Sequence, residues 1–371
     1  MAEQVVIIGG GLAGLITSLH LRQHGISCTI IERNHYPFHR VCGEYVSNEV
    51  VDYLKNLGAF PEILGPSQIR IFHLTSVTGR SATLPLDLGG FGISRYAFDH
   101  HLFRLAQQRG VRFQLDTEAT HVHLDNDHFV VETDHGSLEA EAVVGSFGKR
   151  SRLDKTLNRQ FITRRSPYVG VKYHIRLPNF PTDVIALHNF SLGYCGVSAV
   201  ENETVNLCYL THRDNIRNFG KLQSMEEAVL CKNPALAEIF RQATFLFKSP
   251  ETINEISFES KSPVEDHILM CGDSAGMISP LCGNGMAMAI HSAKTLTEHL
   301  VRFFNSDCTR KELEENYAAA WKKEFAFRLW AGRNIQRLFG SNFASQSAVF
   351  MANHLKPVAY RLMKMTHGKP F

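Results

Sequence analysis

A glycine-rich turn close to the start of the chain constrains the fold more strongly than any other feature. Residues 4–8 form a short apolar run with β-branched side chains, and the sequence GGGLAG follows at residues 9–14. A helical pattern then ends near Gly25, and residues 27–31 form a second β-rich run. This order predicts a strand, a helix and a second strand joined by a right-handed connection. We therefore expect a Rossmann-like α/β unit.

The spacing of the glycines predicts what this turn binds. Gly9, Gly11 and Gly14 form a GxGxxG frame. In such a frame the first glycine allows the tight turn, the second lets a pyrophosphate approach the backbone, and the third allows the helix and the strand to pack closely. Leu12 and Ala13 open the helix, and a helix N-terminus carries partial positive charge. The pattern indicates a bound dinucleotide.

An acidic residue at the end of the second strand narrows the choice of nucleotide. Glu32 lies 18 residues after Gly14, and Arg33 follows it among the expected cofactor contacts. A carboxylate at this position accepts hydrogen bonds from a ribose diol and disfavours a 2′-phosphate. The alternative for Glu32 is an ordinary solvated strand end. The nucleotide is therefore expected to be FAD or NAD.

A second glycine-bearing motif favours FAD. Residues 267–290 read HILMCGDSAGMISPLCGNGMAMAI, which predicts a strand, the pair Gly272 and Asp273, and a glycine-rich stretch leading into a helix. This run resembles the GD motif of the p-hydroxybenzoate hydroxylase and geranylgeranyl reductase superfamily of flavoproteins. The resemblance implies that Asp273 holds ribityl or ribose hydroxyls of FAD. It also places a loop along the isoalloxazine edge, with contacts from Pro280, Gly283, Asn284, Gly285 and Met286.

A third segment resembles the superfamily but departs from it. Residues 143–154 read VVGSFGKRSRLD, and Phe147-Gly148 stands where the family usually has Asp-Gly. Gly148 remains an expected FAD contact, but the loss of the Asp weakens direct nicotinamide docking. NADH or NADPH is one electron donor that the resemblance allows, and a reductase partner is the other. Lys149 and Arg150 either meet phosphates or are exposed basic residues.

Two further segments match the family by context. Arg95 heads the stretch that follows Ser94 into a helix and is expected to contact the flavin or the pyrophosphate. The sequence RVCGEYVS at residues 40–47 resembles the segment of the geranylgeranyl reductase branch that reaches toward the flavin. The cofactor contacts expected from it are Arg40, Val41, Cys42 and Gly43.

Cys42 and Glu44 are the candidate catalytic residues in that segment. Cys42 is a small packed hydrophobe, a proton donor beside the flavin, or a redox partner of Cys282. Glu44 is a general acid or base if its carboxyl is desolvated, or else forms a salt bridge with an Arg.

The rest of the chain predicts a second domain and a helical end. Short β-rich segments between residues 168 and 210 are typical of an antiparallel meander, expected to roof the substrate pocket. We expect a discontinuous FAD-binding domain, an inserted antiparallel β-sheet substrate domain and a helical C-terminal segment. Their expected ranges are 1–70, 95–165 and 255–305 for the first, 71–94 and 166–254 for the second, and 306–371 for the third.

These features predict an FAD-dependent oxidoreductase. By resemblance to geranylgeranyl reductases, it would reduce or dehydrogenate carbon–carbon bonds of a prenyl, polyene or acyl-like substrate, free or linked to a carrier or lipid, by hydride transfer at flavin N5. The alternative is an FAD-dependent monooxygenase that hydroxylates an aromatic substrate. A halogenase is disfavoured because the WxWxIP motif is absent and the tryptophans are Trp321 and Trp330. An electron-transfer flavoprotein ranks last because no iron–sulfur cysteine cluster is present.

Composition narrows the partners. A formal net charge of +3 is too even for a nucleic-acid-binding protein, so no nucleic acid is expected. The 8 cysteines form no CxxC pair, and the 19 histidines show no ligand frame, so we expect neither disulfides nor a metal site. A cytoplasmic location fits these cysteines, and no apolar run is long enough to predict a membrane-spanning helix.

The last part of the chain is locally basic and aromatic. Seven Lys or Arg and no Asp or Glu lie between Arg328 and Phe371. The charges belong either to a solvated helical face or to a contact with an anionic membrane or an acidic carrier partner. The aromatic residues of the tail recur at helical spacing and are expected in the core, with a lining for an apolar substrate as the alternative: Trp321, Phe325, Phe327 and Trp330.

Overall fold

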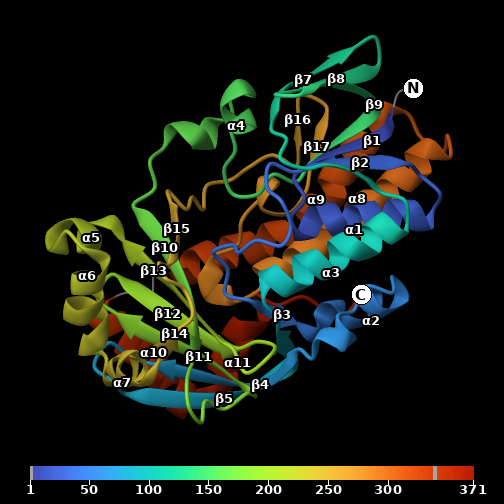
Figure 1. Ribbon diagram of the computed structural model, residues 1–371. Helices are drawn as coiled ribbons and strands as arrows, with labels where there is room; N and C mark the ends of the chain where they lie inside the picture. The colour runs from blue at the N-terminus through green and yellow to red at the C-terminus, as the bar shows by residue number, and fades with distance from the viewer. Residues whose placement is uncertain (1–2, 337–340) are drawn as a thin grey trace.

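Two β-sheets and a layer of helices make up the computed structural model, which describes residues 3–336 and 341–371 (Figure 1). The first sheet has the strand order β16-β17-β9-β1-β2-β6, with β7 and β8 extending from β9. Its strands are β1 (Glu3–Ile8), β2 (Cys28–Ile31), β6 (Arg112–Gln114), β7 (Ala119–Asp125), β8 (His128–Thr133), β9 (Gly136–Gly145), β16 (Val264–Glu265) and β17 (Ile268–Met270).

The predicted βαβ unit is present at the centre of this sheet. Helix α1 (Leu12–Gln23) connects β1 to β2, and the two strands are parallel, with Val6 opposite Thr29. Strand β9 pairs in parallel with the other edge of β1. Every residue of β2 is buried, as expected for a parallel strand covered on both faces. Packing on both faces therefore explains why these strands read as continuous apolar runs.

The second sheet has the order β14-β10-β13-β12-β11-β4-β5-β3, with β15 also on β10. The predicted meander is confirmed, because β10 pairs antiparallel with β13, β13 with β12, and β12 with β11. Strand β4 pairs in parallel with β11, and β3 joins the far edge, so this sheet takes segments that precede residue 71. Its strands are β3 (Tyr45–Ser47), β4 (Ser67–Thr75), β5 (Ser81–Gly92), β10 (Tyr168–Arg176), β11 (Val184–Phe190), β12 (Gly193–Ala199), β13 (Val205–His212), β14 (Thr244–Phe245) and β15 (Glu251–Asn254).

Helices cover both sheets. Figure 1 shows α5, α6 and α7 at the outer end of the second sheet, far from α1 and α3 beside the first. The helices ahead of the last layer are α2 (Val51–Asn56), α3 (Arg95–Gln108), α4 (Leu153–Thr156), α5 (Arg213–Phe219), α6 (Leu222–Val229) and α7 (Pro234–Gln242). Separate apolar cores lie under these groups, one around the first sheet and one around β10 to β13.

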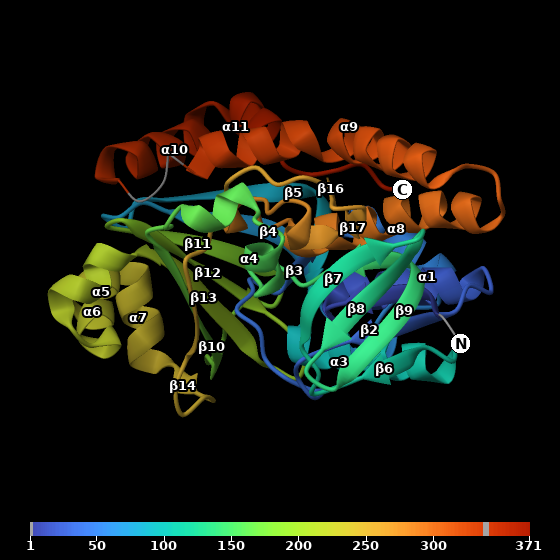
Figure 2. The same ribbon diagram turned by 90° about the horizontal axis from the view of Figure 1, so that it is seen from above.

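The C-terminal segment is helical, as predicted. It follows α8 (Gly285–Phe304) and consists of α9 (Arg310–Gln336), α10 (Asn342–His354) and α11 (Lys356–Lys364). Figure 2 shows α9, α10 and α11 as an outer layer on one side of both sheets. No helix in the described ranges combines the length and the apolar character that crossing a bilayer requires.

The expected burial of the tail aromatics is only half right. Trp321 and Phe325 are buried in the core of the first sheet. Phe327 and Trp330 are 56% and 52% exposed and stack on each other with ring centroids 5.8 Å apart. The prediction of core packing is wrong for these two, because helical spacing cannot tell which apolar stripe of α9 faces the sheets.

The first glycine turn is held by very close backbone packing. Gly9 has a φ of +103°, and a Cβ there would lie 2.5 Å from the carbonyl oxygen of Ser146. A Cβ on Gly14 would lie 2.2 Å from the carbonyl oxygen of Gly9. The third glycine of the frame therefore acts as expected, by letting α1 approach β1.

We predict that Gly14→Ala lowers the free energy of unfolding by about 1–3 kcal/mol, because the added methyl group meets rigid backbone. Urea denaturation of the purified protein measures this change. Gly196→Ala is the control, because a Cβ there has only an ordinary contact at 3.7 Å. Equal stability of the two variants would contradict the packing argument.

Candidate functional site

One large cavity joins the two sheets. It has a volume of about 890 Å³, within the range of roughly 300–1,000 Å³ typical of small-molecule sites. Its lining combines the ends of β1 and β2, residues 38–45, the second sheet, the start of α8 and the inner faces of α10 and α11. The cavity therefore has one end at the glycine turn and an apolar limb under the C-terminal helices.

The glycine-turn end is built for a phosphate group. Helix α1 starts after Gly11, without a side-chain hydrogen bond at its N-cap and without an acidic residue in its first turn. A Cβ on Gly11 would lie 3.6 Å from the nearest Arg95 nitrogen and 4.0 Å from Arg40. A helix N-terminus and two guanidinium groups thus converge on one glycine, which is the donor set that a pyrophosphate requires.

Two carboxylates hold those guanidinium groups in place. Arg95 donates from Nε and Nη2 to the two oxygens of Asp99, each at 2.7 Å. Arg40 donates from Nη2 to Glu32 at 3.1 Å. Burial acts to lower the pKa of Arg95, but the carboxylate of Asp99 raises it above its ordinary value. Arg95 therefore stays charged inside the protein.

Glu32 lies at the end of β2, where the sequence placed it. Its side chain is 4% exposed, and Oε2 accepts a hydrogen bond from the Gly10 amide at 2.9 Å. Oε1 accepts from the amide and the side chain of Asn34 at 3.0 and 2.8 Å. Together with Arg40 these donors engage the roughly four acceptor sites of a carboxylate, so a ribose hydroxyl would share or replace one of them. Arg33 lines the same end of the cavity.

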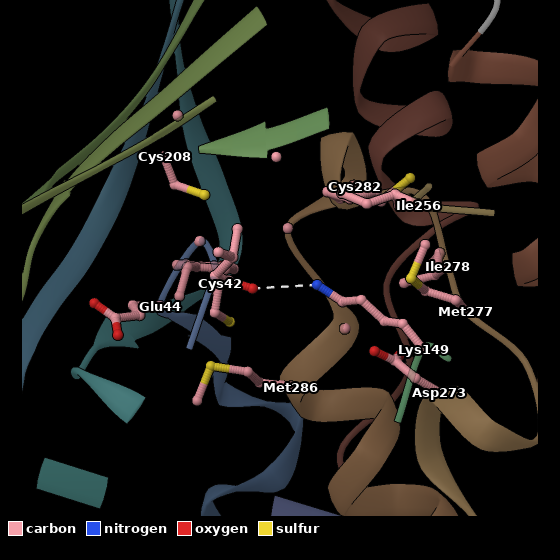
Figure 3. Close-up of a pocket in the computed structure, with 18 of the residues that line it drawn as sticks. Cys42, Glu44, Lys149, Cys208, Ile256, Asp273, Met277, Ile278, Cys282 and Met286 are labelled. Carbon is pink, nitrogen blue, oxygen red and sulfur yellow. Dashed lines mark hydrogen bonds between the residues drawn. The ribbon is translucent and has the colours of Figure 1, made fainter. Parts of the chain in front are cut away.

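The carbonyl groups of the loop at residues 40–44 are all engaged by other parts of the protein. The carbonyl groups of Arg40 and Val41 accept hydrogen bonds from Lys172 Nζ at 3.2 Å and from Lys149 Nζ at 3.1 Å (Figure 3). Those of Cys42, Gly43 and Glu44 accept from Asn206 Nδ2 at 3.2 Å, Ser198 Oγ at 3.5 Å and the Ile93 amide at 3.0 Å. The amides of residues 41–44 have no acceptor among the described residues. The loop lines the cavity, so these donors suit a ring that carries carbonyl and nitrogen acceptors.

Glu44 is a buried anchor of this loop. Its side chain is 0% exposed, and Oε1 accepts hydrogen bonds from the Arg95 amide at 2.8 Å and from Lys172. Oε2 lies 2.7 Å from Nε2 of His174. Burial alone would raise the pKa of Glu44, but Lys172 and His174 more than offset it and hold the pKa below its ordinary value. Glu44 is therefore an ionised carboxylate.

Sequence reasoning missed both partners of Glu44. It expected an arginine, whereas Lys172 and His174 come from β10, two residues apart and on one face of that strand. The available signal was a Lys and a His within the apolar strand sequence GVKYHIR. Each is buried, and buried charges require partners.

Four cysteines line the cavity: Cys42, Cys208, Cys271 and Cys282. Figure 3 shows Cys208 on the same side as Cys42, whereas Cys282 lies across from them on the loop before α8. All the cysteines of the described chain are free. Burial raises the pKa of Cys208 and of Cys282 to about 12, so both remain neutral thiols.

The GD turn and the loop before α8 form the opposite wall. Asp273 lines the cavity, and Lys261 Nζ donates to its backbone carbonyl at 2.8 Å. Burial lowers the pKa of Lys261 to about 8. Helix α8 begins at Gly285 without a side-chain cap, and Gly283, Gly285 and Met286 line the cavity there.

The structure brings most of the expected site residues together. The lining includes Gly9, Gly11, Leu12, Ala13, Glu32, Arg33, Arg40, Val41, Cys42, Gly43, Glu44, Arg95, Gly148, Asp273, Pro280, Gly283, Gly285 and Met286. Gly14, Gly272 and Asn284 lie outside the lining. A Cβ on Gly272 would lie 2.9 Å from the Cβ of Ala13. Asn284 donates its side-chain amide to the Thr366 carbonyl at 3.0 Å. Contacts within the protein therefore explain why Gly272 and Asn284 do not line the cavity.

The other limb of the cavity is apolar. Strands β4, β5 and β11 and helices α10 and α11 face one another across it. Its lining includes Phe72, Leu74, Leu84, Leu86, Leu187, Leu210, Ile253, Met351, Leu362 and Met363. A surface of this kind binds a long apolar chain and excludes water. Sequence analysis expected the meander here, with the tail aromatics as an alternative lining. Those aromatics lie outside the lining, and the contribution of α10 and α11 was missed.

The sequence matches the FAD binding domain family over residues 2–321. Digeranylgeranylglycerophospholipid reductase 1 of Methanopyrus kandleri is 22% identical over 358 residues, which cover 91% of both chains. The 1H-pyrrole-2-carbonyl-[peptidyl-carrier protein] brominase of Pseudoalteromonas luteoviolacea is 21% identical over 355 residues, covering 90% of this chain and 82% of the brominase. A geranylgeranyl bacteriochlorophyll reductase-like protein of Thermoplasma acidophilum has a similar fold, with a TM-score of 0.81, 16% identity and coverage of 100% and 96%.

We predict that Glu44→Gln lowers the free energy of unfolding by about 3 kcal/mol, because it leaves Lys172 buried without its counter-ion. Lys172→Met in the same chain should recover part of that loss. The stability from Glu44 is present above the ordinary carboxyl pKa and is lost as the pH falls through the lowered folded value. Urea denaturation of the unaltered protein, Glu44→Gln and the double variant, repeated across acidic pH, measures these changes in the free energy of unfolding. A Glu44→Gln difference that persists unchanged in acid would contradict the assignment of an ionised carboxylate.

Proposed function

The chain belongs to the FAD binding domain family and is an FAD-dependent oxidoreductase, and we propose that it reduces or dehydrogenates carbon–carbon bonds of a long apolar substrate. The observation that carries the proposal is the continuity of the cavity, which joins the cofactor end to an apolar limb. The limb suits a prenyl, polyene or acyl-like chain, free or attached to a lipid or carrier. We assign the first sheet to the cofactor and the second sheet with α10 and α11 to the substrate.

The donor set fits FAD. The N-terminus of α1, Arg40 and Arg95 would hold the pyrophosphate, and Glu32 would accept hydrogen bonds from the ribose. Asp273 would hold the ribityl hydroxyls. The amides of residues 41–44 and the start of α8 would donate to the ring, where α8 also stabilises negative charge. When bound, FAD supplies hydride transfer at N5, and the remaining work of binding, orientation and proton supply belongs to this chain.

Cys42 is our proposed proton donor. Cys42 lies in the loop whose free amides we assign to the ring, and this loop lines the cavity. Glu44 is a poor donor because Lys172 and His174 keep it ionised. We therefore separate the two candidates: Glu44 positions the loop, and Cys42 gives a proton to the second carbon of the reduced bond.

A monooxygenase or halogenase is the competing function, and substrate-dependent flavin reoxidation distinguishes them. The FAD-loaded protein is reduced with dithionite under anaerobic conditions and then mixed with a polyprenyl alcohol. We expect the flavin absorbance to return without oxygen and the alcohol to lose a double bond. Reoxidation that requires oxygen and yields a hydroxylated product, or a halogenated one when halide is added, would overturn the reductase proposal. Replacing dithionite by NADH or NADPH tests the donor.

We predict that Cys42→Ala slows this anaerobic reoxidation by about 10²-fold or more, because a positioned acid contributes roughly that factor. The flavin content and its absorbance should not change. Cys231→Ala is the control, because this thiol lies outside the cavity lining. An unchanged rate in Cys42→Ala would remove Cys42 as the proton donor.

A further inference from the structure

The outer layer of C-terminal helices exposes a group of large apolar side chains. Phe343 is 85% exposed and Phe350 is 59% exposed, and they lie seven residues apart on one face of α10. With them we define the C-terminal surface as the apolar residues Phe327, Trp330, Phe343, Phe350, Leu355 and Val358 and the cations Arg333, Lys356 and Arg361. Exposed apolar patches with a polar rim mark interaction sites.

The charged residues of this surface are cations, although the exposed Glu324 lies one helical turn before Phe327 on α9. The sequence from residue 328 to residue 371 contains no Asp or Glu. Lys356 and Arg361 are exposed and form no ion pair with any residue that the structure describes. Lys364 is different because it pairs with Asp87 at 2.9 Å. Arg337 belongs to the basic stretch but lies outside the described residues. The free cations complement an anionic surface.

The inner faces of the same helices line the apolar limb. Ala348 and Met351 of α10 and Met363 of α11 face the cavity. Phe343 belongs to both surfaces, because it lines the cavity and is also largely exposed. The apolar limb therefore reaches the protein exterior at the start of α10, within the C-terminal surface.

We propose that the C-terminal surface docks on an anionic lipid bilayer and that the apolar limb opens toward it. The aromatic side chains enter the boundary between headgroups and acyl chains, and the cations lie at the lipid phosphates. An acidic carrier protein would satisfy the cations but would need a matching pocket for each protruding phenylalanine. The inference rests on the proposed function for its substrate, which would be a lipid-resident chain.

Vesicle cosedimentation of the FAD-loaded full chain tests the docking. One set of vesicles is phosphatidylcholine, and the other contains equal parts of phosphatidylcholine and phosphatidylglycerol. We expect binding to the mixed vesicles, little binding to phosphatidylcholine alone, and release from the mixed vesicles by salt. Salt should release the protein because the electrostatic screening length falls from about 10 Å at 0.1 M to about 3 Å at 1 M. Failure to bind the mixed vesicles would overturn the proposal.

Two pairs of matched variants locate the surface. Lys356→Gln with Arg361→Gln should weaken binding by about 30-fold, near fivefold for each cation. Arg217→Gln with Lys221→Gln removes the same charge from α5 and the start of α6 and should leave binding unchanged. Phe343→Ser with Phe350→Ser should weaken binding by about tenfold or more, whereas Ile63→Ser with Phe219→Ser should not. Equal binding of test and control variants would overturn the proposal.

The flavin absorbance of each variant separates misfolding from loss of docking. It also separates this inference from the proposed function, because the lipid assay needs no turnover. Retention of the protein by an immobilised acyl carrier protein, with no binding to either vesicle, would replace the membrane by an acidic carrier and so contradict the proposal.

Discussion

The buried carboxylate of Glu44 joins the two halves of this protein. It receives a hydrogen bond from the Arg95 amide at the start of α3 and contacts Lys172 and His174 of the second sheet. The ion pair fixes residues 40–44, whose carbonyl groups are all engaged by the surrounding protein. A buried ion pair is stable in few geometries, so it holds the free amides of this loop in fixed positions.

The two ends of the cavity use different chemistry. The glycine-turn end offers backbone amides, glycine turns and a few fixed charges, which are the donors in set positions that our proposal assigns to the phosphates and the flavin ring. The apolar limb relies on shape and on the exclusion of water. Helices α10 and α11 connect that limb to the outside, and their opposite faces form the C-terminal surface. One short helical segment therefore lines the apolar limb and presents the proposed lipid contact.

Local patterns in the sequence predicted much of the fold. The GxGxxG frame predicted β1, α1 and β2 because its glycines act within a few residues of one another. Short β-rich segments separated by turn-rich pieces predicted the meander for the same reason. The parallel pairing of β4 with β11 was not predicted, since it joins segments more than a hundred residues apart. The exposure of Phe327 and Trp330 was also missed, because the apolar spacing of α9 does not reveal how much of its surface the sheets cover.

The sequence by itself determined a nucleotide-binding α/β unit, an FAD-dependent enzyme family and most of the residues that line the glycine-turn end of the cavity. These follow from short motifs in which the chemistry and the spacing are inseparable. Tertiary structure alone decided that Glu44 pairs with Lys172 and His174, that Cys208 lies beside Cys42, and that α10 and α11 line the apolar limb. Each of these depends on distant segments meeting in space, and the energy of a buried charge or an apolar contact exists only once the partner has been brought to it.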